Sequence, residues 1–152
     1  MIESAAMIRI HALILAAVVA TAIPLSAQTT QFRARLAMVP TDLAMQQTIA
    51  GLGAATASLK GNTLTVTGTF SGLKTAATAV RIHRSAKAGM RGTPIGDLTA
   101  TQGTSGTIGG SIELTKEQVA DLAAGRMYIQ LHSQKAPDGN LWGWLFAAAE
   151  KK

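Results

Sequence analysis

The sequence contains no cysteine, few acidic residues and few aromatic residues, and each shortage narrows what the protein can be. Without cysteine, disulfides, thiolate metal ligands and a thiol nucleophile are excluded, so packing and sheet pairing must supply the stability. The 8 acidic residues against 14 basic residues give a formal charge of +6. This charge favours acidic partners such as anionic lipid headgroups, polyanionic polysaccharide or an acidic protein surface.

Residue patterns on which common catalytic sites depend are also missing. No serine stands in a nucleophile-elbow context, and no pair of carboxylates has a plausible spacing. The glycine-rich stretch 103–110 lacks the lysine and the following helix of a phosphate-binding loop. We therefore expect that the chain is not an enzyme.

The longest apolar run lies near the N-terminus and predicts an export signal over residues 1–27. Arg9 supplies a positive charge, Ile10 to Leu25 is almost entirely apolar, and Leu25 to Ala27 offers small residues for cleavage. A retained membrane anchor is the alternative, although this run is short against the roughly 20 residues that span a bilayer. We expect a periplasmic or secreted protein whose domain comprises residues 28–152, with membrane contact only if the N-terminal segment is retained.

From Gln28 onward, short alternating runs predict an all-β domain. Phe32 to Val39 alternates apolar with polar or small residues and stops at Pro40, as a first strand would. Thr63 to Phe70 alternates cleanly after a turn signal and predicts the outgoing strand of a hairpin. Leu64, Val66 and Phe70 would share its inner face. The spacing of these strands predicts a β-sandwich of about seven or eight strands, which 152 residues can build as one domain with a real core.

One short helix interrupts the strands. Ile112 to Gly125 contains a capping box formed by Thr115 and Gln118, and Gly125 is a typical helix stop. The preceding Gly, Thr and Ser residues of 103–110 predict a linker.

Met127 to Ala147 contains both tryptophans and the only tyrosine, and it predicts the best-specified packing in the chain. Its residues alternate before and after a Pro-Asp-Gly-Asn segment at 137–140, which predicts a hairpin with its turn at those four residues.

The order of these features resembles the chordin-type, or CHRD, domain. That family has A-H-I-H before a glycine-rich loop and V-H-T-x-x-x-P-x-G-E-I-R-G-Q-L near its end. This chain has R-I-H ending at His83, a helix followed by L-x-x-G-x-x-Y, and L-H-S-Q-K-A-P-D-G-N-L-W-G-W-L over 131–145. The resemblance covers about residues 32–146. It implies an exported immunoglobulin-like or superoxide-dismutase-like antiparallel β-sandwich with one short helix, found in bacteria as a single domain, and it implies no known reaction.

Two histidines fall at positions where the family pattern has histidine. His83 matches the second histidine of H-x-H and His132 matches that of the terminal motif, but Arg81 replaces the first histidine and cannot bind a metal. Copper or zinc normally takes three or four ligands, so Asp97 or Asp138 would have to complete a site. The alternative is structural: the two rings lie side by side and hydrogen-bond the backbone or each other. We expect no cofactor, with copper or zinc as the alternative.

The stretch from Arg81 to Gly92 predicts a basic loop at one end of the sandwich. It contains no acidic residue and four basic residues, namely Arg81, Arg84, Lys87 and Arg91. Such a loop on a rigid scaffold could dock a polyanion or an acidic partner, or it could be a solvated loop that keeps the protein in solution. Nucleic acid is not expected as a partner, because export separates the protein from it and the loop has no interleaved aromatic residues.

Trp142, Trp144 and Phe146 are expected to lie on one side of the last strand. On the inner side they would be core, and on the outer side they would form an exposed aromatic strip. The family pattern has polar residues at positions 142 and 144, which favours the outer side. We therefore expect a non-catalytic extracytoplasmic binding or structural module, such as an accessory subunit of another exported or membrane protein complex.

Overall fold

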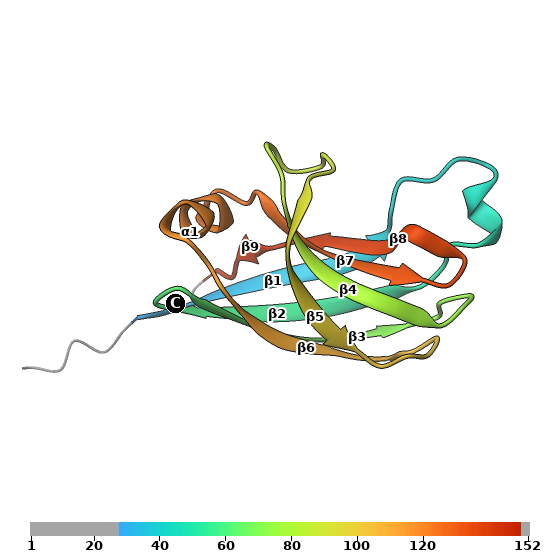
Figure 1. Ribbon diagram of the computed structural model, residues 1–152, viewed down its shortest axis with the longest axis horizontal. Coiled ribbons are helices and arrows are strands. Elements are labelled where there is room, and N and C mark those ends of the chain that lie inside the picture. Colours follow the sequence, from blue (N-terminus) through green and yellow to red (C-terminus); the bar gives the residue numbers. More distant parts are fainter. Residues whose placement is uncertain (1–27, 150–152) are drawn as a thin grey trace, which may run out of the picture.

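Antiparallel strands make up most of residues 28–149, which are the residues that the computed structural model describes (Figure 1). The predicted signal segment 1–27 lies outside them. The strands are β1 (Thr29–Met38), β2 (Leu52–Lys60), β3 (Thr63–Ser71), β4 (Ala77–Arg84), β5 (Thr93–Ala100), β6 (Gly106–Glu113), β7 (Met127–Ser133), β8 (Ala136–Trp144) and β9 (Phe146–Ala147). A short 3₁₀ helix, η1 (Met45–Gln47), follows β1, and α1 (Lys116–Ala123) follows β6.

The strands close into a barrel. Their order is β2-β3-β6-β5-β4-β7-β8-β1, and β1 also pairs with β2, so the ring of eight strands is complete. The short strand β9 continues along the side of β1 that β8 occupies. The all-β, antiparallel prediction with one short α-helix is confirmed, but the predicted immunoglobulin-like or superoxide-dismutase-like sandwich is wrong, because the strands close into a barrel. Two seams join the halves: Ala37 and Met38 pair with β8, and Thr99 and Ala100 pair with β6.

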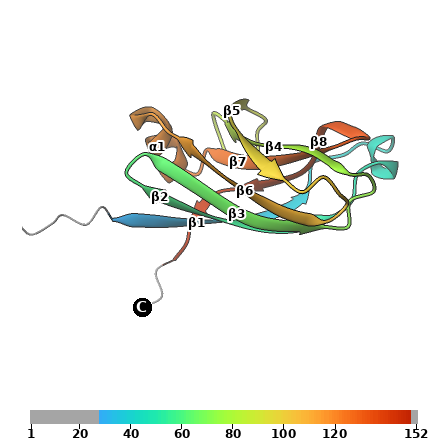
Figure 2. The ribbon, with the colours of Figure 1, turned by 60° about the horizontal axis from the view of Figure 1, so that its bottom comes forward.

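Both seams are short, so the barrel is flattened into two layers (Figure 2). One layer contains β1, β2, β3 and β6, and the other contains β5, β4, β7 and β8. Alternate residues of every long strand point between the layers. Leu64, Val66 and Phe70 are buried there, as their spacing predicts, and Ile129 and Leu141 face them from the other side of one continuous core. Burying each such side chain contributes roughly 1.5–3 kcal/mol.

The helix forms where its capping signals predict it. Thr115 Oγ1 accepts a hydrogen bond from the Gln118 amide (3.2 Å), and Gln118 Oε1 accepts one from the Thr115 amide (2.9 Å). Gly125 ends the helix with φ +71°, a conformation that costs a glycine little. Leu122 is fully buried and anchors the helix against the barrel.

The glycine-rich stretch 103–110 is not a linker, because β6 begins at Gly106 and pairs with β3 along its whole length. Small residues are needed here. A Cβ on Gly106 would lie 2.3 Å from Cβ of Thr101, and one on Gly110 would lie 3.1 Å from a methyl group of Leu98. The composition that is typical of a linker therefore reflects close packing of β6 against the chain that precedes it.

The hairpin 127–147 forms, but its turn is not at 137–140. Gln134 and Lys135 make the turn, and residues 137–140 form a bulge in β8 opposite the single residue His132. The Asn140 side chain fixes this bulge, since Nδ2 donates to the Ala50 carbonyl (2.7 Å) and Oδ1 accepts from Ser133 Oγ (3.0 Å). The turn signal is overruled by these buried side-chain hydrogen bonds. Within residues 28–149, no helix has both the length and the apolar character that crossing a bilayer requires.

Candidate functional site

Five of the predicted site residues lie on the outer face of the layer formed by β5, β4, β7 and β8, namely Arg81, His83, His132, Trp142 and Trp144. Cross-strand pairing places His83 beside Tyr128, and Tyr128 beside Trp144. The next row places Arg81 beside Gln130, and Gln130 beside Trp142. The residues between them along each strand, namely Ile82, Ile129 and Gly143, are buried in the barrel. In β4, β7 and β8, the side chains of these two rows therefore point out of the barrel and the residues between them point into it.

Tyr128 is the centre of an aromatic cluster outside the barrel. The His83 ring stacks on it with centroids 4.8 Å apart and planes 10° apart. Trp144 lies 4.6 Å and Trp142 5.6 Å from the Tyr128 ring, and the two indoles meet edge to face at 5.9 Å. Although it points away from the core, Tyr128 is only 1% exposed. The cluster is thus a second, small packing centre that holds both tryptophans in fixed positions.

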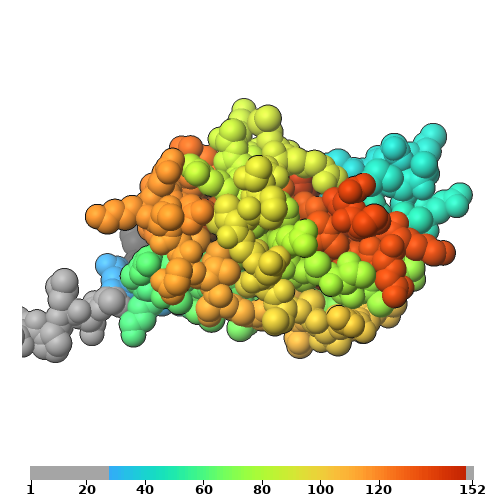
Figure 3. All heavy atoms as spheres, in the orientation of Figure 1, coloured from blue at the N-terminus to red at the C-terminus, as the bar shows by residue number. Residues whose placement is uncertain are grey.

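The loop between β4 and β5 covers part of this cluster and stands out at the top of the surface in Figure 3. The Gly92 amide donates a hydrogen bond to the Tyr128 hydroxyl (3.0 Å). Arg91 donates to the Asp138 carbonyl (2.9 Å), to which Gln130 Nε2 also donates (2.8 Å). The loop is therefore tied both to the centre of the aromatic cluster and to the β8 bulge.

His83 and His132 lie next to each other beneath this loop, with ring centroids 6.3 Å apart. His132 Nδ1 lies 2.8 Å from the Pro137 carbonyl. Because a carbonyl only accepts hydrogen bonds, Nδ1 carries the proton of the neutral ring and Nε2 keeps its lone pair. His132 Nε2 and His83 Nδ1 are buried and find no hydrogen-bond partner among residues 28–149.

Burial keeps both imidazoles neutral. The pKa of His83 is lowered to about 4, first by burial and then by the neighbouring His132. The backbone of Arg81 acts in the opposite direction, and the positive charges of Arg81 and Arg91 lower the pKa further. Burial also lowers the pKa of His132, while the hydrogen bond to Pro137 acts in the opposite direction. Near neutral pH, each ring therefore presents one uncharged nitrogen without a partner.

The carboxylates expected to complete a metal site are not assembled with the histidines. Asp97 bonds the Nε of Arg81 at 2.9 Å and is 82% exposed in its side chain. Asp138 contributes its backbone carbonyl to Arg91 and Gln130. In the described part of the chain, no three His, Cys, Asp or Glu residues come together as potential metal ligands.

Two of the four cations predicted to form a basic loop are neutralised by acids from other elements. Arg81 pairs with Asp97, and Arg84 pairs with Glu117 and Asp121 of α1. Asp121 is buried and is shared with Arg126 (3.2 Å), which fixes the loop base to the helix end. Lys87 and Arg91 have no carboxylate partner within residues 28–149. The positive charge of this loop is smaller than its sequence indicates.

The aromatic side chains of β8 and β9 lie beside arginines that the sequence reading did not single out. Phe146 is 53% exposed and pairs with Arg33 of β1, while the partly exposed Trp142 pairs with Ala37. Arg35 lies between Arg33 and Ala37 on the same outer side of β1 and is exposed. The alternation of β1 could have placed both arginines outside the barrel. Only the pairing of β1 with β8 and β9 places them beside the aromatic row.

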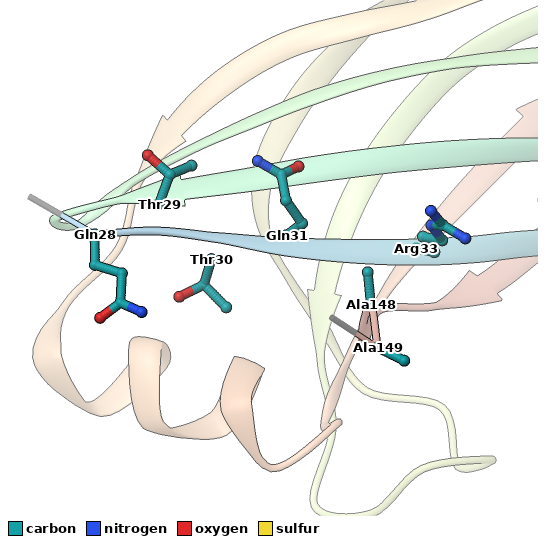
Figure 4. Close-up of a pocket in the computed structure, with 7 residues that line it drawn as sticks. All are labelled: Gln28, Thr29, Thr30, Gln31, Arg33, Ala148 and Ala149. Atoms are coloured by element: carbon teal, nitrogen blue, oxygen red, sulfur yellow. The ribbon is translucent and has the colours of Figure 1, made fainter. Parts of the chain in front are cut away.

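A shallow hollow lies where β1 begins and the chain leaves β9 (Figure 4). It is lined by Gln28, Thr29, Thr30, Gln31, Arg33, Ala148 and Ala149. These side chains include no acid and no histidine, and none belongs to the predicted site. The hollow therefore offers no constellation for catalysis or metal binding.

The chain was compared with protein families, with curated proteins and with solved structures. The family model of the CHRD domain matches residues 32–145, which include β2 to β8, α1 and all but the first residues of β1. No significant match was found among curated proteins or among solved structures. The match covers the histidine-bearing strands and the terminal hairpin together. The chain belongs to the CHRD domain family.

Proposed function

We propose that this chain is a non-catalytic, exported binding module that docks on another extracytoplasmic or membrane protein as an accessory subunit. The observation that carries the proposal is the outward row of Trp142, Trp144 and Phe146 beside the exposed arginines of β1. We call this set of residues, with Arg33 and Arg35, the aromatic–arginine face.

The composition of the aromatic–arginine face is that of a protein interface. Tryptophan and arginine are enriched among the residues that dominate binding energy, because they combine a large apolar area with hydrogen bonding or charge. Trp142 and Trp144 are already held by Tyr128, so little side-chain freedom would be lost when a partner covers them. A fixed aromatic pair favours a defined docking geometry over non-specific adhesion.

The charge of the face indicates an acidic partner. Arg33 and Arg35 form no salt bridge within residues 28–149, whereas Arg81 and Arg84 do. The chain as a whole carries a formal charge of +6. Arginine without an internal carboxylate can pair with carboxylates of a partner, in bidentate geometry that also fixes orientation.

The test is recovery of a partner from the native host with the full-length chain. We expect Trp142→Ala with Trp144→Ala to abolish co-purification of that partner. The same change also lowers thermal stability, because both indoles pack on Tyr128 and Trp142 packs against the buried cluster of Val39, Ile49 and Ala136. A charge reversal, Arg33→Glu with Arg35→Glu, should also abolish co-purification. Both arginine side chains are exposed, so this change removes no buried contact. The matched control, Lys60→Glu with Lys116→Glu, changes two exposed cations elsewhere and should retain the partner.

Retention of the partner by both the double tryptophan variant and the double arginine variant would refute docking through this face. Loss of the partner only in a tryptophan variant that has also lost most of its stability would show instead that the indoles are structural. The arginine variant separates these outcomes.

A further inference from the structure

We propose that His83 and His132 form a two-coordinate site for a monovalent soft metal ion, copper(I), beneath the loop that joins β4 and β5. This site is separate from the aromatic–arginine face and does not rest on the docking proposal.

The first support is the pair of unpartnered nitrogens. His83 is 6% and His132 8% exposed, and His83 Nδ1 and His132 Nε2 are buried without a hydrogen-bond partner in the described chain. Leaving a buried polar atom without a partner costs roughly 1–3 kcal/mol, so two such atoms on neighbouring rings favour a ligand between them. Gln130 Oε1, on the same outer face of β7, is buried without a partner as well. The Pro137 carbonyl fixes the His132 ring so that the free nitrogen is Nε2, as an outer-shell acceptor does for metal-bound histidine.

The second support is the separation of the rings. A ring nitrogen lies about 1 Å from its centroid and a metal–imidazole bond is about 2 Å long, so two imidazoles on opposite sides of one metal ion have centroids about 6 Å apart. The centroids of His83 and His132 are 6.3 Å apart, and the two ring planes are tilted by 37°. A direct hydrogen bond between the rings would bring the centroids to about 5 Å. The observed separation therefore suits one atom held between the two rings.

The third support concerns which metal ion the surroundings accept. Zinc and copper(II) normally take three or four ligands, and no third His, Cys, Asp or Glu joins the two histidines within residues 28–149. Copper(I) is stable with two neutral imidazoles in a linear arrangement. The positive charges of Arg81 and Arg91 reach both rings, whereas the negative charge of Asp138 reaches only His132. The two arginines repel a dication more strongly than a monocation.

The loop and the Tyr128 ring that enclose the two histidines would retain a bound ion rather than admit a substrate to it. His83 stacks on the buried Tyr128, and the Gly92 and Arg91 hydrogen bonds hold the loop in place above. With two protein ligands in line and no open position, the ion would be held and shielded from solvent. We therefore assign the site to copper(I) storage or to stabilisation of the loop, with no change of oxidation state during its action.

The experiment titrates the purified full-length protein with copper(I), under anaerobic conditions with a reductant and a competing coloured chelator. One copper(I) per chain is expected, and X-ray absorption should report two nitrogen neighbours in a linear arrangement. His83→Asn and His132→Gln should each lower the affinity by more than about 100-fold, whereas His11→Gln, which removes the remaining histidine, should leave it unchanged. Asp97→Asn should also leave it unchanged, because no carboxylate takes part.

A second measurement covers the case in which a histidine variant fails to fold. In the unaltered protein, copper(I) should shift the imidazole nitrogen NMR signals of His83 Nδ1 and His132 Nε2 and leave that of His132 Nδ1 in its hydrogen-bonded range. Sub-stoichiometric copper(I), retention of full affinity by both histidine variants, or tighter zinc binding that depends on Asp97 would overturn the proposal. Unshifted imidazole signals would show that copper(I) does not bind these two nitrogens and would likewise overturn the proposal.

Discussion

Mild acid is expected to destabilise the metal-free protein through His83. The pKa of this residue is about 4 in the folded chain, against 6.5 for an ordinary histidine. Since folding lowers the pKa, the proton binds the unfolded state more tightly, and the stabilisation is complete above pH 6.5 and disappears as the pH falls toward 4. At about 1.4 kcal/mol for each pKa unit, the loss reaches about 3 kcal/mol.

The charged groups around His83 oppose its protonation. His132 on β7, the guanidinium of Arg81 and Arg91 in the covering loop all disfavour a positive charge on the ring, and only the backbone of Arg81 acts in the opposite direction. The pKa of His132 is lowered as well, so its protonation adds to the loss of stability as the pH falls below the ordinary histidine value. Because the whole stability of a domain is typically about 5–15 kcal/mol, the loss from His83 alone is a large fraction of it.

Urea unfolding between about pH 7.5 and pH 4.5, with a chelator present, measures this effect. The control is His83→Asn, which keeps a polar side chain but removes the titrating group. The free energy of unfolding of the unaltered protein should fall more steeply with acid than that of the variant, and the difference isolates His83 from the carboxylates. Parallel pH profiles for the two proteins would refute the reasoning, because His83 would then have the same pKa in both states.

Two further changes test the fold itself. Thr115→Ala removes the cap of α1 and should lower the free energy of unfolding by about 1 kcal/mol in chemical denaturation, whereas no change would mean that the capping box does not hold the helix. Gly143→Ala should cost more, about 1–3 kcal/mol or above, because the new Cβ would lie 2.6 Å from the Arg35 carbonyl and push β8 away from β1. Gly109→Ala is its control, since its Cβ would meet no atom closer than 3.9 Å, and equal stability losses for the two glycine variants would contradict this account.

Local patterns predicted the strands and the helix well. The alternation of Leu64, Val66 and Phe70 predicted one buried face, and Thr115 with Gln118 predicted the start of α1. Closure of the barrel could not be predicted in the same way. It depends on the register between β1 and the hairpin at the other end of the chain, and no pattern in either segment specifies that register.

The position of the hairpin turn shows how tertiary contacts override a local signal. Pro-Asp-Gly-Asn is a strong turn sequence, yet the buried Asn140 side chain bonds Ala50 and Ser133, from two different parts of the fold. These hydrogen bonds fix residues 137–140 as a bulge. The bulge in turn supplies the carbonyls that hold His132, Gln130 and Arg91.

The sequence predicted several residues of the candidate site, but it did not predict how they are arranged. The spacing of His83, His132, Trp142 and Trp144 identified the chemical groups that the outer face carries. The burial of Tyr128 under a loop, and the loss of free charge when Arg81 and Arg84 pair with acids, depend on contacts between distant elements. The same is true of Arg33 and Arg35, which acquire aromatic neighbours only through the closing strands.

The pairing of β1 with β8 and β9 also governs when this protein can fold. Arg33 of β1 pairs with Phe146 of β9, although roughly 110 residues separate them in the sequence. The first strand of the barrel therefore gains its second neighbour only from the last strands of the chain. During synthesis, β1 therefore has only β2 as a partner until the terminal hairpin appears. Until then, the side of β1 that β8 and β9 cover in the finished barrel is an open sheet edge, which can pair with another chain. The terminal hairpin therefore removes an exposed edge as well as completing the barrel.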